Sequence, residues 1–423
     1  MSNRAFVALV AAGFLCAVPI AGRQAPTGRS GRGGGFDQVA LPDGGGKELV
    51  QTACSECHGL GQVANSGGYD HQGWQLTVER MVTDGAKVPP NQVPLVVDYL
   101  TKAFPEQPKP RAVLIPGSAT VNIKEWEVPT KGSRPHDPLA TPDGMIWYTG
   151  MYANVLGRLD PKTGQIKEFH LNTAKSGPHG LTADKAGNIW FTANSKGYVG
   201  KLDPKGGEIV EYPMPDPAAR DPHTPIFDQK GNLWFTLQNS NMIGRLDPQS
   251  GAIKLVTSPT PRSNPYGMVV NSKGVPFLVE FGSNKVMSLD PVTMAIREYP
   301  LPNADSRPRR IAITSDDVIW YSDYSRGYLG RLDPVSGKVT EWASPGGPKS
   351  QPYGITALHD VIWYSESAVK PNTLVRFDPK TEKFQTWAIP SGGGVVRNMM
   401  TTRDGNLVMA ESGVNKVALV EVK

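Results

Sequence analysis

A motif that recurs seven times, at intervals of 43 to 45 residues, limits the fold of this chain more than any other feature. Each copy contains four short β-like runs separated by turn residues. A unit of this length with four strands is typical of a β-propeller blade, and 46 glycines and 38 prolines among 423 residues agree with a turn-rich fold. The residues that align the copies are Trp147, Trp190, Trp234, Phe277, Trp320, Trp363 and Val408.

The number of runs also predicts how the ring is closed. The seventh copy ends after its third run, residues 416–420. Its missing fourth strand has a match at residues 123–129, which resemble the fourth run of the fourth copy, residues 296–300. An N-terminal strand that completed the last blade would leave no open sheet edge. We therefore expect residues 121–423 to form an all-β seven-bladed propeller closed by an N-terminal strand.

The text of the repeats resembles the streptogramin lyase (virginiamycin B lyase) family of seven-bladed propellers. The resemblance rests on Pro-His-Gly-Leu-Thr at 178–182, Asn-Ile-Trp-Phe-Thr at 188–192 and Gly-Lys-Leu-Asp-Pro at 200–204. It covers all seven copies, about 300 residues. Because propellers carry many unrelated functions, the resemblance implies the architecture more strongly than the activity.

The same resemblance implies a possible catalytic site for ring opening by elimination. In that family two histidines on neighbouring blades act with two carboxylates around a magnesium ion. His179, Asp221 and His223 match three of these places and are the candidate catalytic residues. The fourth place holds Leu237, which removes a charge that a hard cation needs, so we expect weak or absent lyase activity.

Two positions in each repeat should point to the same end of the ring: the start of the innermost strand and the end of the second strand. These polar side chains either pair with one another around a wet axial channel or bind a divalent metal or a polar, zwitterionic small molecule. The start positions hold His136, His179, His223, Tyr266, Arg309, Tyr353 and Arg397. Four of the end positions hold carboxylates, Glu280, Asp323, Glu366 and Glu411, so half of this face should be acidic.

A second motif lies before the repeats. Cys54, Cys57 and His58 form the C-x-x-C-H pattern of covalent c-type haem attachment. The two cysteines would form thioether bonds to the haem, and His58 would bind the iron. A zinc site is the alternative, but it needs four ligands. The sequence has no second pair of cysteines, and no cysteine–histidine pair, to complete them. The motif therefore predicts one covalently bound haem c.

Residues 40–104, which surround this motif, resemble a small class I cytochrome c domain, and the chain is therefore expected to be multidomain, with this small all-α domain before the propeller. Helices are expected over 47–54, 74–81 and 91–104. In such cytochromes the sixth iron ligand is usually a methionine beyond the motif, which implies Met81. His71 is the alternative and would give a lower potential.

The N-terminus has the pattern of an export signal. Arg4 precedes an apolar stretch that ends at Ile20, which predicts a signal peptide over residues 1–21. A Gly-rich linker should follow over 22–39, and a Pro-rich linker over 105–120. Export would place the protein in the periplasm, and retention of the signal as a membrane anchor is the alternative.

Together these features predict a periplasmic electron-transfer protein with a monohaem cytochrome c and a propeller that docks a redox partner protein or binds a small ligand. The alternative is a propeller enzyme, either a dehydrogenase that passes electrons to the haem or a metal-dependent C–O lyase. The oxidoreductase is favoured between the two because a lyase has no use for a haem. A ligand sensor without catalysis is a third possibility. A net charge of +5 with both signs interspersed gives no case for nucleic acid.

Overall fold

The computed structural model describes residues 39–55, 60–64, 66–83 and 86–423. The predicted signal peptide and the predicted Gly-rich linker, except for its last residue, lie outside these ranges. The chain divides into two compact units, one that ends at Gln107 and one that runs from Pro108 to Lys423. Among the helices described, none is long and apolar enough to cross a membrane.

The first unit is helical. Three of its helices, α1, α3 and α4, overlap the three segments that the sequence predicts to be helical. Pro94 lies in the first turn of α4, where its missing N–H removes no helical hydrogen bond. The elements are α1 (Lys47–Ser55), α2 (Gly61–Ala64), α3 (His71–Thr83), the 3-10 helix η1 (Pro90–Gln92) and α4 (Val93–Ala103).

A small apolar core holds these helices together. It includes Val50 from α1, Trp74 from α3, and Val97 and Leu100 from α4, all of them buried. The Trp74 indole N–H donates a hydrogen bond of 2.9 Å to the Phe104 carbonyl and so connects α3 to the end of α4. A unit of this size buries little apolar surface in total, so each core contact matters for its stability.

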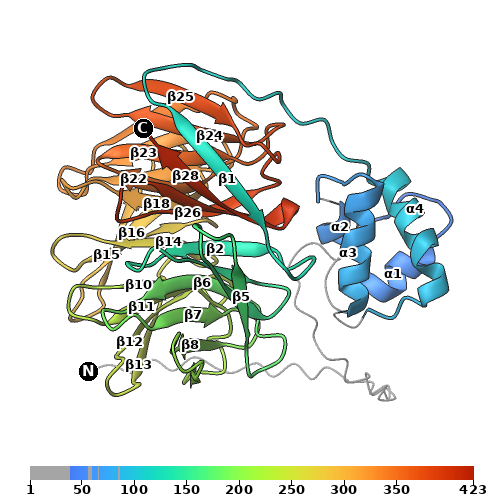
Figure 1. Ribbon diagram of the computed structural model, residues 1–423, viewed down its shortest axis with the longest axis horizontal. Helices are drawn as coiled ribbons and strands as arrows, with labels where there is room; N and C mark the ends of the chain where they lie inside the picture. The colour runs from blue at the N-terminus through green and yellow to red at the C-terminus, as the bar shows by residue number, and fades with distance from the viewer. Residues whose placement is uncertain (1–38, 56–59, 65, 84–85) are drawn as a thin grey trace, which may run out of the picture. The chain divides into compact units, whose positions relative to one another are not determined.

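Seven four-stranded antiparallel sheets form the second unit and confirm the predicted seven-bladed propeller (Figure 1). In blades one to six the strands run outward from the axis in chain order. Blades one to three are β2 (Pro135–Ala140), β3 (Ile146–Gly150), β4 (Val155–Leu159), β5 (Ile166–His170); β6 (Pro178–Ala183), β7 (Ile189–Ala193), β8 (Tyr198–Leu202), β9 (Ile209–Pro213); and β10 (Pro222–Phe227), β11 (Leu233–Leu237), β12 (Met242–Leu246), β13 (Ile253–Thr257).

The remaining blades repeat this order, except that the outermost strand of blade seven, β1, comes from the start of the unit. Blades four to six are β14 (Pro265–Val270), β15 (Pro276–Glu280), β16 (Lys285–Leu289), β17 (Ile296–Pro300); β18 (Pro308–Ile313), β19 (Ile319–Asp323), β20 (Tyr328–Leu332), β21 (Val339–Ala343); and β22 (Pro352–Leu358), β23 (Val361–Glu366), β24 (Thr373–Asp378), β25 (Lys383–Ala388). Blade seven is β26 (Val396–Thr401), β27 (Leu407–Glu411), β28 (Lys416–Val422) and β1 (Val121–Glu127), with the 3-10 helix η2 (Ser412–Val414) before β28.

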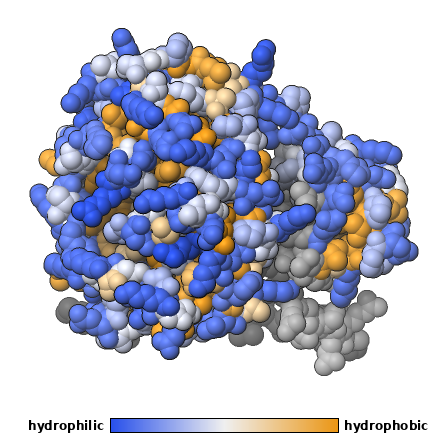
Figure 2. All heavy atoms as spheres, in the orientation of Figure 1, coloured by the Kyte–Doolittle hydropathy of each residue, from blue (hydrophilic) through white to orange (hydrophobic). Residues whose placement is uncertain are grey.

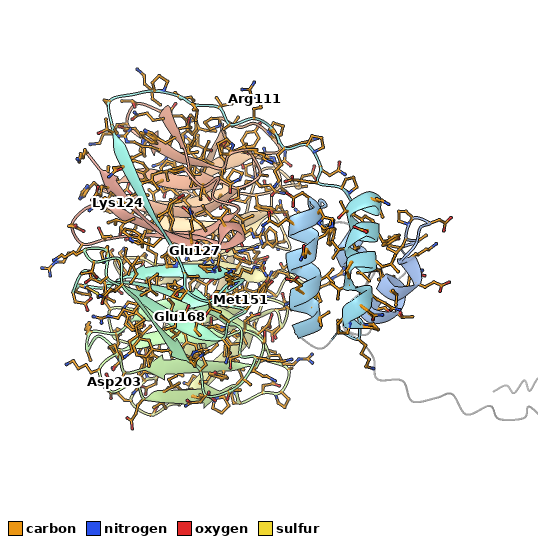
Figure 3. The ribbon with its side chains drawn as sticks, turned by 45° about the vertical axis from the view of Figure 1, so that its right-hand side comes forward. Arg111, Lys124, Glu127, Met151, Glu168 and Asp203 are labelled. Carbon is orange, nitrogen blue, oxygen red and sulfur yellow. The ribbon has the colours of Figure 1, made fainter. Side chains whose placement is uncertain are left out.

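The innermost strands form a complete ring. Each one from β2 to β22 contacts the next, and β26 contacts both β22 and β2. In blade seven, β1 pairs antiparallel with β28, from Val121 opposite Val422 to Glu127 opposite Lys416. Figure 1 shows β1 beside the dark red β28, and Figure 3 labels Lys124 and Glu127 on β1. The strand that pairs with β28 thus includes residues that the repeat pattern matched to a fourth strand.

The position of a strand within its blade explains its sequence. Second strands such as β7 lie between neighbouring sheets and are buried along their whole length. Fourth strands such as β9 alternate between partly buried and exposed residues, because one face meets water. In several blades the tryptophan that marks the repeat stacks on an aromatic side chain of the fourth strand, as Trp190 does on Tyr212 at 5.4 Å between ring centroids. The marker residues of the repeat are therefore core residues of the blades.

Hydroxyl groups connect neighbouring blades close to the axis. Thr192 of β7 accepts a hydrogen bond from the Gly180 N–H of its own blade at 2.9 Å and donates one to the His223 carbonyl of the next blade at 2.6 Å. Each such bond fixes the backbone at the start of the next innermost strand. The same two bonds are made by Thr149, Thr236 and Ser322.

Part of the segment predicted as a Pro-rich linker is bound to blade six. The Ala112 N–H donates to the Lys370 carbonyl at 3.2 Å, and Ile115 exchanges hydrogen bonds with Thr386. The face of the molecule shown in Figure 2 is mostly hydrophilic. Large exposed apolar side chains include Leu95 on α4 and the adjacent Val113 and Leu114 in the segment bound to blade six.

Candidate functional site

The candidate site lies at the end of the propeller where the innermost strands begin. There the first residue of each innermost strand pairs with the last residue of the second strand, as Pro135 does with Gly150 and Pro265 with Glu280. The two positions singled out in the repeats therefore lie at the same end of the ring. The hydroxyl bonds between blades hold the backbone of several of these residues, including His179, His223 and Tyr353.

Three histidines form a row of tilted rings at this end of the axis. The ring centroids of His136 and His179 are 3.7 Å apart, and those of His179 and His223 are also 3.7 Å apart. Tyr266 continues the row, with its ring centroid 4.0 Å from that of His223. All four side chains are buried, so the row closes the middle of the ring on this side.

The histidines are held in their neutral form. Burial is the largest cause that lowers the pKa of each well below its usual value, because a charged ring would lose its hydration. The positive charges of Arg397 and Arg310 lower the pKa of His136 further. His179 Nδ1 is buried and has no hydrogen-bond partner among the described residues, so it remains able to bind a ligand atom.

Arg309 is surrounded by aromatic rings. Its guanidinium carbon lies 4.0 Å from the ring centroid of Tyr353 and 4.3 Å from that of Tyr324. Phe281 and Tyr266 complete this aromatic cage at 4.6 and 5.3 Å. Cation–π contacts of this kind fix the orientation of a guanidinium group without neutralising it. The site therefore contains a positive charge in a defined position.

Tyr353 is a tyrosine of the site whose hydroxyl has a lowered pKa. Its hydroxyl oxygen is 2.6 Å from that of Tyr266. Burial by itself would raise the pKa of Tyr353, but the positive charges of Arg309, Arg397 and Arg310 lower it to about 8. A phenol with this pKa can release or accept a proton near neutral pH.

An ion pair that the sequence analysis did not identify crosses the ring below the histidine row. Arg310 Nη2 of blade five lies 2.6 Å from Asp137 Oδ1 of blade one, and both side chains are at most 3% exposed. Asp137 Oδ1 also lies 2.9 Å from His136 Nδ1. Asp137 and Arg310 directly follow His136 and Arg309, the strand-start positions of their repeats. At this point a shift in strand register makes two consecutive residues oppose one residue of the partner strand. The signal for this ion pair in the sequence was a charged residue inside a predicted innermost strand.

The four carboxylates do not make the face acidic, which corrects the expectation from the sequence. Burial raises the pKa of Glu280 to about 7 and that of Glu411 to about 8. Asp323 is paired with Arg326 at 3.2 Å, and Glu366 accepts hydrogen bonds from the hydroxyls of nearby residues. Within the part of the chain that the structure describes, none of the four forms an ion pair with Arg309 or Arg397.

The metal hypothesis can be tested on two groups of residues. His136, Asp137 and His179 each offer a donor atom, and these atoms lie within 4.8 Å of one another. However, Asp137 already binds the guanidinium of Arg310, so a divalent cation would lie beside a positive charge.

The set implied by the lyase resemblance fits a metal less well. The two oxygens of Asp221 accept hydrogen bonds from the backbone N–H groups of Asn239 and Ser240, and the buried Leu237 offers no ligand atom. A hard cation prefers several free oxygen ligands. The set of His179, Asp221 and His223 therefore offers a divalent cation fewer free oxygen ligands than the resemblance implies.

In the helical unit, Cys54 of the C-x-x-C-H motif and Met81 line the same cavity of about 150 Å³. Most of the other lining residues are apolar and include Val78 and Leu100. His71, the alternative iron ligand, is exposed, and its Nε2 lies 3.3 Å from Asp98 Oδ1. Cys57 and His58 lie outside the described residues.

Fold and site together define a seven-bladed β-propeller protein with a polar, cationic end to its axis. The chain belongs to the Virginiamycin B lyase family, whose family model matches residues 117–281 and 277–423. This match confirms the family resemblance of the repeats. It assigns the propeller to a family of propeller enzymes and supports an enzymatic or binding role for this unit.

Solved structures of lyases have the same fold. A streptogramin B lyase is 26% identical, covers 72% of this chain and 98% of its own, and has a TM-score of 0.66. Virginiamycin B lyase from Staphylococcus aureus is 24% identical over 71% of this chain and 99% of its own, with a TM-score of 0.65. Hydrazine synthase from Kuenenia stuttgartiensis shares the fold at 13% identity over 69% of this chain and 96% of its own, with a TM-score of 0.58. A search of curated proteins finds no match.

Proposed function

We propose that this is an exported two-unit redox protein. Its propeller binds a small polar ligand with an anionic group where the innermost strands begin. Its helical unit carries one covalent c-type haem and exchanges electrons with a partner protein in the periplasm. The observation that carries the redox part is the apolar cavity that Cys54 of the C-x-x-C-H motif shares with Met81.

The described residues that line the cavity are of the kind that surrounds a haem, but the cavity of about 150 Å³ is smaller than the whole group. The apolar lining would exclude water from the ring, and Met81 presents a thioether, the side chain that commonly binds haem iron opposite a histidine. When bound, the haem supplies a one-electron carrier. The exposed position of His71 favours Met81 as the sixth ligand.

The haem assignment is tested by replacing both cysteines of the motif. The double variant Cys54→Ala with Cys57→Ala should lose the haem that survives denaturing electrophoresis, because each cysteine supplies one thioether. Ser55→Ala is a matched control, since Ser55 lies between the two cysteines of the motif and supplies no bond to the haem. Retention of covalent haem in the double variant would exclude this function.

The propeller part rests on the charges at the strand-start end. Arg309 is fixed by its aromatic cage, and Arg397 lies close enough to lower the pKa of Tyr353. The Nε atoms of both arginines are buried and lack partners among the described residues. Unpaired guanidinium N–H groups favour a carboxylate or phosphate acceptor. Arg397→Gln should therefore weaken the binding of such a ligand, and a metabolite screen monitored by thermal shift would identify it.

A second candidate function is oxidation of the bound ligand. It is favoured by Tyr353, whose pKa of about 8 suits a group that accepts a proton from a substrate. In this case a substrate should reduce the haem, and Tyr353→Phe should slow haem reduction without preventing binding. Haem reduction that is equally fast in Tyr353→Phe would exclude this role.

Lyase chemistry of the kind named for the solved relatives is the weaker alternative. Asp221 is held by backbone hydrogen bonds, and Leu237 occupies the place of a carboxylate. A catalytically inactive variant of the Staphylococcus aureus enzyme has been solved with quinupristin, so quinupristin is the substrate to try. We expect magnesium-dependent opening of quinupristin to be absent or very slow. Efficient turnover would replace the ligand-binding proposal for the propeller.

A further inference from the structure

A separate cavity lies on the ring axis, on the other side of the Asp137–Arg310 ion pair. Its volume is about 290 Å³, and all seven innermost strands contribute residues to its wall. The histidines and the caged Arg309 of the strand-start end do not line it. The propeller therefore has two different environments along one axis, divided by a buried ion pair.

This axial cavity changes from apolar to polar along its length. Its wall consists mainly of aliphatic and thioether side chains such as Leu181, Met268 and Ile355. The polar end is formed by Asp137, Thr224, Arg310 and Asn398. At the other end, lining residues near the ends of the innermost strands, such as Ile313, Ala357 and Thr401, are partly exposed. The cavity therefore leads from solvent to a buried charged group.

The polar end holds one positive and one negative side chain, Arg310 and Asp137, and the positive charge of Arg397 lies near them. Arg310 carries five N–H groups, and its Nη atoms contact Asp137 and Thr224. Its buried Nε has no partner among the described residues, and an unpaired buried donor costs free energy that an acceptor would restore. The charges of Arg310 and Arg397 both lower the pKa of His136, so Arg397 adds a second positive charge near the Asp137–Arg310 pair.

We propose that the axial cavity binds a small monocarboxylate with an apolar chain. The carboxylate lies against Arg310, and the chain follows the apolar wall toward the open end. If each non-hydrogen atom takes roughly the 30 Å³ of a water molecule, the cavity holds about ten such atoms, which is the size of octanoate. A ligand with an ammonium group is disfavoured by the excess of guanidinium charge.

The head group is tested by calorimetry on the full-length protein with octanoate, 1-octanol and octylamine. These three ligands have alkyl chains of similar length and differ in the head group. Octanoate should bind once per chain and at least tenfold more tightly than 1-octanol, because only the carboxylate pairs with Arg310. Octylamine should not bind. Absence of octanoate binding, or octylamine binding as tight as octanoate, would overturn the proposal.

The location is tested by filling the cavity from β22. Ala357→Phe places a ring in the cavity and should weaken octanoate binding at least tenfold. Ala343→Phe makes the same change at an exposed position on β21 and should have no effect. Unchanged octanoate affinity in Ala357→Phe would place octanoate elsewhere and refute the proposal.

The role of Arg310 needs a variant that still folds. Replacing it alone would leave Asp137 as a buried charge without a partner, so Asp137→Asn is combined with Arg310→Gln. This double variant should melt normally and lose the preference for octanoate over 1-octanol. A retained tenfold preference would contradict the proposal. None of these variants touches the haem motif or Arg397, so a negative result here leaves the proposed function to its own tests.

Discussion

Tyr353 shows how neighbouring charges can outweigh burial at a single residue. Because the surrounding guanidinium groups lower its pKa to about 8, an ultraviolet titration should show one tyrosine ionising about two pH units below the ordinary value of ~10. Tyr353→Phe should remove this step, whereas Tyr212→Phe on the outermost strand β9 should not. A step that persists in Tyr353→Phe would mean that another tyrosine feels these charges.

The histidine row should make the propeller sensitive to acid. Because the folded-state pKa of each histidine lies below the unfolded value of ~6.5, the unfolded chain binds more protons below that pH, and stability falls as the pH drops from ~6.5 toward the lowered pKa. His179→Gln should reduce this slope by about one proton, or ~1.4 kcal/mol per pH unit. Urea denaturation between pH 7 and 5 measures it, with the exposed His170→Gln as the control. Equal slopes for wild type and His179→Gln would contradict the neutral row.

At the level of residues, the sequence predicted which side chains share the strand-start end but not how they interact. The periodic repeat was enough to align His179, His223 and Tyr353. It did not predict the Asp137–Arg310 pair, because a charged residue inside an innermost strand does not reveal which residue of another blade it will pair with. Nor could it predict that burial would raise the pKa of Glu411, since that depends on packing between blades.

The second strands act as connectors between blades, and Thr192 of β7 allows a test of this role. Replacing Thr192 by valine keeps the shape but leaves the Gly180 N–H and the His223 carbonyl without a partner. Loss of buried partners of this kind should lower the free energy of unfolding by about 1 to 3 kcal/mol. Thr340→Val on the outermost strand β21 is the matched control and should change it by less than about 0.5 kcal/mol. Chemical denaturation measures both, and equal effects would show that the bonds between blades add nothing.

At the level of elements, the blades were predictable because each repeat encodes the same four strands around a buried aromatic residue. Residues 121–127 could be recognised as a strand because they carry the fourth-strand pattern. The sequence predicted a linker for the part of the Pro-rich segment that is bonded to blade six. Its hydrogen bonds to Lys370 and Thr386 join residues more than 250 positions apart, and contacts at such a separation leave no local pattern in the sequence. Such long-range backbone pairing has no sequence pattern of its own.

At the scale of the whole molecule, the two units differ in how they are stabilised. The propeller closes its innermost strands into a ring and buries a large aromatic core between blades. The helical unit has a small core around a cavity of about 150 Å³ that Cys54 and Met81 help to line. A unit with a small core buries little apolar surface on folding and gains little stability from it. Without haem, the helical unit should therefore be the less stable of the two.

This difference predicts two separate thermal transitions for the full-length protein in calorimetry. A haem bound only by the folded helical unit stabilises that unit by linkage, so the Cys54→Ala with Cys57→Ala variant should lower one transition and leave the other unchanged. Thr192→Val should do the opposite, because its lost hydrogen bonds lie entirely within the propeller. A single transition that moves in both variants would show that the units unfold together, and the haem would then stabilise the propeller as well.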